Sequence, residues 1–162
     1  MTFLDFIILW IHIFFAIIFV GGSFFIWIVV WPASFDLSDD PKERTRIVGR
    51  IAKRFAYFTH ISVAILIVTG IYNATWYLND NIDELFTTPG GRILLVKIIL
   101  VGVALLIIYT NNMYHGKRIM QLSKEGKHDA VQRMRKVTHL FSFISLALLL
   151  IIVGLATALQ FY

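Results

Sequence analysis

The sequence predicts an all-α integral membrane protein, a four-helix bundle with both termini outside the cytoplasm and two basic loops inside it. Three observations predict this fold: four long apolar segments, few charged residues, and basic residues confined to alternate loops. Hydrophobic residues make up 58% of the 162 residues and charged residues only 15%. A soluble domain of this length would expose more charge. Because the length suits one domain, we expect residues 1–162 to form a single transmembrane domain.

Four segments contain the run of about 20 mostly apolar residues that a helix needs to cross a bilayer. They cover residues of about 3–31, 55–78, 93–114 and 137–162. Trp31-Pro32 is expected to end the first span, because proline cannot continue a helix. The turn residues TTPGG at 87–91 open the third span. The first span is too long for a signal peptide, and it lacks the preceding basic residues and the cleavage site, so we expect it to be retained.

The distribution of basic residues sets the predicted orientation. Thirteen of the fifteen lysines and arginines lie at 32–54 and 116–136, whereas 79–92 carries only Arg92 against three acids. Four alternating spans place both basic segments on one side, which is cytoplasmic by the positive-inside rule. This topology explains the net charge of +5 and argues against a nucleic-acid partner. We therefore expect a multi-pass protein of the cell membrane, surrounded by lipid.

Ionisable side chains inside a bilayer are costly and mark functional sites. The candidates are His12, His60, Lys97 and His139, with His115 as a further candidate at the inner end of the third span. At a rise of about 1.5 Å per residue, His12 and Lys97 lie about 9 Å to the outer side of their span midpoints. His60 lies about 10 Å and His139 about 15 Å to the inner side. The sequence therefore predicts an outer level and an inner level of candidate ligands.

Histidines at similar depth on different helices of a bundle can supply the axial ligands of a haem b. The pair His60 and His139 suits ligation by two histidines, and His12, with Lys97 as second ligand or propionate partner, suits an outer haem. Lys53, Arg54 and Lys136 lie where the propionates of an inner haem would emerge.

Copper is the alternative metal, because imidazole is a copper ligand. The histidines His12, His60 and His139, with His115 as a further candidate, would then be the metal ligands. Cysteine is absent, which excludes disulfides, iron–sulfur clusters and thiolate zinc sites. The four methionines lie at segment ends or in loops, so no methionine-lined pathway crosses the predicted spans. A third hypothesis is that the histidines only join neighbouring helices by hydrogen bonds.

Three segments of the sequence resemble the copper resistance D (CopD) family of membrane proteins. They are HIFFAIIFVGGSFFIWIVVWP at 12–32, RFAYFTHISVAILIVTGIYNA at 54–74 with its Thr-Gly pair, and TTPGGRILLVKIILVGVALLI at 87–107 with its lysine. The resemblance implies copper uptake or copper handling, often beside a periplasmic copper chaperone.

The same frame is similar to the membrane-bound, oxygen-independent protoporphyrinogen oxidase family. That family has a histidine in its first helix and a lysine early in a later helix, both implicated in haem b, and these positions match His12 and Lys97. The oxidase family has Tyr-His where this chain has Tyr109-Thr110. This resemblance implies haem binding more than it implies the oxidase activity.

The sequence thus favours a histidine-centred intramembrane site that binds haem b for transmembrane electron transfer, in a membrane oxidoreductase or an electron-transfer subunit of a larger redox complex. Because the chain has almost no extramembrane mass, a soluble redox partner would be another protein. The alternatives are a copper transport or copper-handling membrane protein and a structural membrane subunit.

Overall fold

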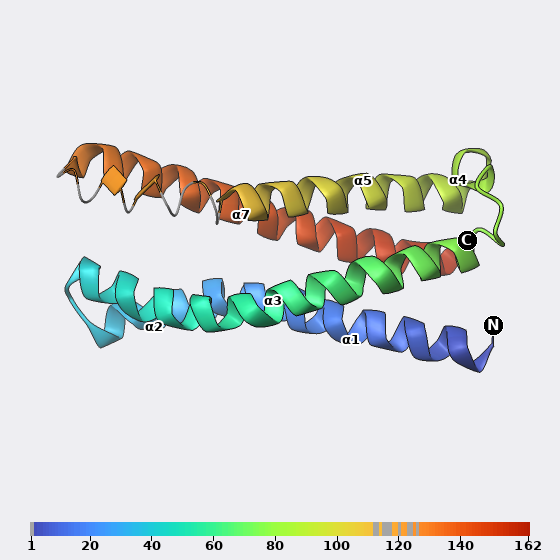
Figure 1. Ribbon diagram of the computed structural model, residues 1–162, viewed down its shortest axis with the longest axis horizontal. Helices are drawn as coiled ribbons and strands as arrows, with labels where there is room; N and C mark the ends of the chain where they lie inside the picture. The colour runs from blue at the N-terminus through green and yellow to red at the C-terminus, as the bar shows by residue number, and fades with distance from the viewer. Residues whose placement is uncertain (1, 112–113, 115–117, 120, 123–124, 126) are drawn as a thin grey trace. The chain divides into compact units, whose positions relative to one another are not determined.

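The computed structural model describes residues 2–111, 114, 118–119, 121–122, 125 and 127–162, and the backbone of these residues is helical with short connections and no strand (Figure 1). Four of the helical segments are long and apolar enough to span a membrane. These are Phe3–Leu37, Arg46–Tyr77, Pro89–Thr110 and Asp129–Phe161. The prediction of an all-α protein with four spans is confirmed, and the protein is a multi-pass membrane protein. The orientation remains a prediction from the positive-inside rule.

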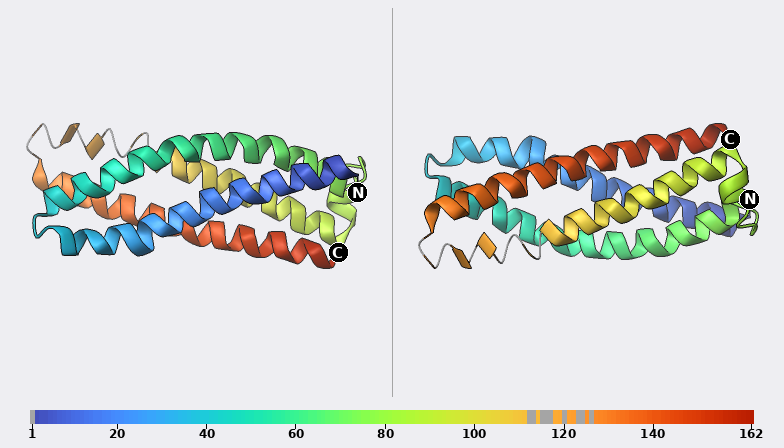
Figure 2. Two further views of the ribbon diagram at one scale, coloured as in Figure 1. Left: turned by 90° about the horizontal axis from the view of Figure 1, so that it is seen from below. Right: turned by 90° about the horizontal axis from the view of Figure 1, so that it is seen from above.

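The chain forms two compact units, residues 1–82 and 83–162, and each is described by itself. In the first unit, two long helical segments run antiparallel, side by side (Figure 1). Its elements are α1 (Phe3–Phe25), the π-helix η1 (Ile26–Val30), α2 (Trp31–Leu37) and α3 (Pro41–Tyr77). In the second unit, α5 packs against α7 (Figure 2). Its elements are α4 (Glu84–Thr87), α5 (Pro89–Thr110), α7 (His128–Ala158) and the 3₁₀-helix η3 (Leu159–Phe161). The prediction of one domain over 1–162 stays a prediction.

Helix α1 begins with a capping box. The Thr2 side chain accepts a hydrogen bond from the Asp5 backbone N–H at 3.2 Å, and the Asp5 carboxylate accepts one from the Thr2 backbone N–H at 2.5 Å. These bonds satisfy two of the amide groups that the start of a helix leaves without a partner in the helix. They also fix Asp5 in the first turn, where only 7% of its surface is exposed.

The helix does not end at Trp31-Pro32, so this expectation was wrong. Residues 26–30 form a π-helix, and α2 then carries the helical path through Pro32 to Leu37. The wider turn changes the hydrogen-bond register just before the proline, since the Trp31 N–H bonds to the Ile26 carbonyl, five residues back. Proline near the start of a helical segment is tolerated, because the amide it lacks needs no partner there.

Helices α3 and α7 extend well beyond the predicted spans. Helix α3 begins at Pro41 rather than near residue 55, and its 37 residues cover about 55 Å at a rise of about 1.5 Å each. Helix α7 begins at His128 rather than near residue 137. Much of the two basic segments is therefore helical. Hydropathy locates only the part of a helix that lies in lipid, whereas lysine, arginine and glutamine are good helix formers in water.

Gly22 of α1 lies directly against the Phe55 ring of α3. A β-carbon at Gly22 would collide with the ring of Phe55 on α3, whereas a β-carbon at the neighbouring Gly21 would meet nothing within 4 Å. Small residues at a helix contact allow such close packing in membranes. Of the two adjacent glycines, Gly22 is therefore the one that packs against α3.

Helix α5 starts at the predicted turn. The Thr88 hydroxyl caps it by accepting from the Gly91 N–H at 2.9 Å, and Pro89 occupies the first turn. A β-carbon at Gly91 would collide with the Glu84 carbonyl of α4, so glycine is needed where α4 folds back on α5.

The outward faces of the helices are apolar. Exposed fractions reach 65% for Ile17, 69% for Val68 and 69% for Leu106. Such exposure would favour aggregation in water but suits contact with lipid tails, and it is consistent with four spans.

Replacing the two adjacent glycines separately tests the packing of α1 on α3. We expect Gly22→Ala to displace the Phe55 ring and to destabilise the first unit by about 1–3 kcal/mol, as overpacking usually does. Gly21→Ala is the matched control and should be neutral or slightly stabilising, because alanine favours helix. Thermal unfolding in detergent measures both; equal melting temperatures would contradict this packing.

Candidate functional site

The outer candidate His12 is joined to α3 by a hydrogen bond to Thr69. Its Nδ1 lies 2.8 Å from the Thr69 Oγ1. The Thr69 hydroxyl donates its single hydrogen to the Ile65 carbonyl at 2.7 Å. The threonine oxygen is then placed to accept from His12, which assigns a proton to Nδ1. In the neutral form of the ring, this tautomer has its lone pair on Nε2.

Thr69 and Gly70 together form the surface of α3 on which the imidazole lies, and we call these two residues the His12 seat. A β-carbon at Gly70 would lie 3.2 Å from the His12 Cε1, closer than ordinary packing allows. The ring of the half-buried His12 therefore packs against the backbone of α3 at Gly70. Thr69 orients the ring, and Gly70 leaves room for it.

A second polar contact joins the same helices near the start of α1. The Tyr72 hydroxyl donates to the Asp5 carboxylate at 2.8 Å. Asp5 and His12 are seven residues apart, which places them on one face of α1, about 10 Å apart along the axis. The face of α1 toward α3 thus carries a carboxylate and an imidazole.

His60 does not share a level with His12 within the first unit. It lies nine residues before Thr69 on α3, or about 13 Å along the axis at a rise of about 1.5 Å per residue. Its side chain is exposed. His12 and His60 therefore cannot bind one metal ion together.

Lys97 and His139 also lie at different levels, in the second unit. The Asn111 amide on α5 donates to the Thr138 carbonyl at 3.3 Å and to the Ser142 hydroxyl at 3.2 Å, which fixes the register of α5 against α7. His139 follows Thr138, whereas Lys97 lies fourteen residues from Asn111, about 21 Å along α5. Both side chains are half-buried, and Lys97 makes no hydrogen bond or ion pair with another described residue.

The two predicted pairings, His12 with Lys97 and His60 with His139, each join a residue of one unit to a residue of the other. Since each unit is described by itself, both pairings stay predictions. His115 lies outside the described residues. Over the residues that the structure describes, no group of three or more histidine, aspartate or glutamate side chains gathers as a preformed metal site.

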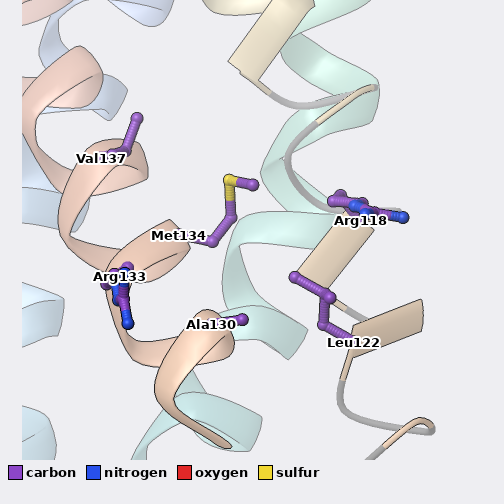
Figure 3. Close-up of a pocket in the computed structure, with 6 residues that line it drawn as sticks. All are labelled: Arg118, Leu122, Ala130, Arg133, Met134 and Val137. Atoms are coloured by element: carbon purple, nitrogen blue, oxygen red, sulfur yellow. The ribbon is translucent and has the colours of Figure 1, made fainter. Parts of the chain in front are cut away.

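An open pocket of about 380 Å³ lies at the basic end of the second unit (Figure 3). Arg118 and Leu122 stand on one side of it and residues of α7 on the other, with the Met134 side chain between them. The remaining lining residues are Ala130, Arg133 and Val137. Met134 supplies the one sulfur among these lining residues, and two guanidinium groups beside it would repel a metal cation, so the pocket is unsuited to copper.

A comparison with protein families matches the segment that carries most of these helices. The model of the family described as "Copper resistance protein D" matches residues 49–155, more than half of the chain. The chain belongs to the copper resistance protein D family. The matched range contains the Thr69-Gly70 seat and Lys97, whereas His12 precedes it. Neither the curated proteins nor the solved structures that were compared give a match.

Membership of the copper resistance protein D family makes this a copper-resistance-related membrane protein, as the first resemblance implied. The similarity to protoporphyrinogen oxidase stays a prediction. Sequence reasoning did not find the bond from Thr69 to His12, although the quoted Thr-Gly pair marked its position. The contacts of Asp5 with Tyr72 and of Asn111 with Ser142 were also missed, because a helical stripe shows which residues share a face but not what they meet.

The role of Thr69 can be tested with two replacements. Thr69→Val keeps the shape but leaves the His12 Nδ1–H without its acceptor, which we expect to cost about 1–3 kcal/mol of stability. Thr69→Ser keeps the hydroxyl and should lose less than half of that amount. Thermal unfolding in detergent compares them; a serine variant as unstable as the valine variant would show that the hydroxyl is not the important group.

Proposed function

We propose that this chain is a copper-handling membrane protein in which His12 supplies an imidazole ligand to the copper ion that is its cargo. Two facts support the proposal: the chain belongs to the copper resistance protein D family, and an oriented imidazole lies within the first span. The observation that carries it is the bond from the His12 Nδ1 to Thr69.

This bond prepares the imidazole for a metal. Histidine ligands in proteins usually bind the metal through one nitrogen and donate a hydrogen bond from the other, which fixes the tautomer and raises the basicity of the ligand. The 2.8 Å contact with Thr69 supplies that hydrogen bond, and the lone pair on Nε2 is the metal-binding electron pair. Cysteine, the usual soft ligand of Cu(I), is absent, so an imidazole is the natural substitute here.

A single imidazole is a weak site, and this suits a cargo rather than a resident ion. A transported ion must bind well enough to enter the membrane but weakly enough to leave it. The described residues assemble no cluster of three charged or imidazole ligands. The remaining positions around a copper ion would be filled by water or by a protein that delivers the ion.

Haem b is the second candidate, because it needs few ligands from the protein. A haem brings four nitrogen ligands of its own and asks the protein for only one or two axial ligands, which a single oriented histidine can begin to supply. His12, with Lys97 as second ligand or propionate partner, would hold an outer haem, and His60 with His139 an inner one. The function would then be electron transfer across the membrane, within a larger redox complex.

Metal analysis of detergent-purified protein distinguishes the two proposals. Under the copper proposal, we expect the wild type to bind Cu(I). We expect His12→Gln to bind it at least about tenfold more weakly, because a metal ligand is lost. His60→Gln is the matched control and should bind as the wild type does. Size-exclusion chromatography checks that both variants keep the fold.

A reduced-minus-oxidised visible spectrum of the same sample tests the second candidate. A Soret band and a sharp α band in protein from haem-replete cells would support haem b, and their loss in His12→Gln would assign the outer ligand. Copper binding unchanged in His12→Gln would overturn the first proposal. Protein that binds neither copper nor haem would leave the histidines as helix-joining groups only.

A further inference from the structure

Two buried polar atoms on α3 have no hydrogen-bond partner among the described residues. They are the Ser62 Oγ and the Asn73 Nδ2. Ser62 precedes Thr69 by seven residues and Asn73 follows it by four, so all three share one face of the helix. Thr69 contacts His12, and this face is therefore turned toward α1. The two unsatisfied atoms flank the His12 seat on both sides.

The polar face continues to the end of the helix pair. Asn73 lies about 6 Å beyond Thr69 along α3, and its neighbour Tyr72 donates to the Asp5 carboxylate. This end of α1 and α3 is opposite the basic segment at 32–54, which the positive-inside rule places in the cytoplasm. From the outer end inward, the contact between the helices thus presents Asp5 with Tyr72, Asn73, His12 with Thr69, and then Ser62.

Lipid cannot satisfy these atoms. A polar group without a partner in a membrane interior costs several kcal/mol, so it finds a partner in the protein or lines a wet cavity. Ser62 is only 1% exposed, and its neighbours in the described chain provide no partner for its hydroxyl. Buried groups of this kind are usually satisfied by ordered water, and polar residues within spans mark the routes of ions.

We propose that the contact between α1 and α3 holds a file of water molecules by which a monovalent metal cation reaches His12 from the outer face. Asp5, at the outer end, attracts the cation, and Asn73 and Ser62 bond to the water on either side of the imidazole. The route rests on the proposed function only in naming His12 as the place where the cation arrives.

The absence of cysteine makes the route directly measurable. Single cysteines at Asn73 and Thr69 probe the route, and Ile71→Cys and Val68→Cys are matched controls at nearly the same depths on the lipid side. Val68 is 69% exposed and Ile71 is 64% exposed, whereas Thr69 is 8% exposed. The probe is the silver ion, which is small enough for a file of water, is insoluble in hydrocarbon and reacts with thiolates.

Silver is added briefly to the outer side of intact cells, and the thiols that remain are counted with a maleimide after denaturation. We expect Thr69→Cys and Asn73→Cys to react at least about tenfold faster than their controls, because an ion cannot reach a thiol that faces lipid. Equal rates at the route and control positions would overturn the proposal and show a dry contact.

The role of Asp5 has its own test. Asp5→Asn removes the charge but keeps an oxygen for Tyr72, and we expect it to slow the reaction of Asn73→Cys with silver several-fold, as loss of local attraction does. An unchanged rate would refute the attraction of cations by Asp5.

No copper is present in these measurements, so the route and the ligand are tested separately. If silver reaches the route positions but copper binding is unchanged in His12→Gln, the route stands and His12 is not the copper ligand. If silver does not reach these positions but copper binding is weakened in His12→Gln, His12 is the ligand and the proposed route is wrong.

Discussion

The hydrogen bond from His12 to Thr69 is the interaction on which the candidate site depends. Lipid tails are as apolar as leucine, so no hydrophobic effect joins the helices in a membrane, and close packing and polar contacts must hold them. In the first unit, Gly22 packs against the Phe55 ring, and the pairs of His12 with Thr69 and Asp5 with Tyr72 provide the polar contacts. The same bond that joins α1 to α3 also determines which nitrogen of the imidazole can bind a metal. The contact of His12 with Thr69 therefore both joins the two helices and orients the candidate ligand.

Under the proposed function, the oriented imidazole of His12 would take the place of the cysteine ligand that this chain lacks. One imidazole with a fixed tautomer is enough for an ion that passes through, and it is also enough to begin the coordination of a haem. Both proposals give His12 the role of a ligand. They differ in what completes the coordination, which is water or a delivering protein in one case and a porphyrin in the other.

Hydropathy was sufficient to predict four spans, because the bilayer imposes a length on each apolar segment. It could not predict helix ends. The rule for proline failed at Pro32, since a π-helix at 26–30 changes the register before it. Thr69, the partner of His12, could not be predicted, because periodicity identifies a face and not the helix that meets it. The pairing of His60 with His139 depends on the arrangement of the two units, which helical periodicity does not specify.

The tautomer of His12 tests the central claim most directly. The four other histidines can be replaced by glutamine, and the remaining imidazole can be labelled with ¹⁵N in lipid bilayers. Solid-state NMR then distinguishes a protonated nitrogen from one with a lone pair. We predict a protonated Nδ1 and a lone pair on Nε2, with the preference lost in Thr69→Val. A ring protonated on Nε2 in the wild type would contradict the account, because the nitrogen assigned to the metal would then carry hydrogen.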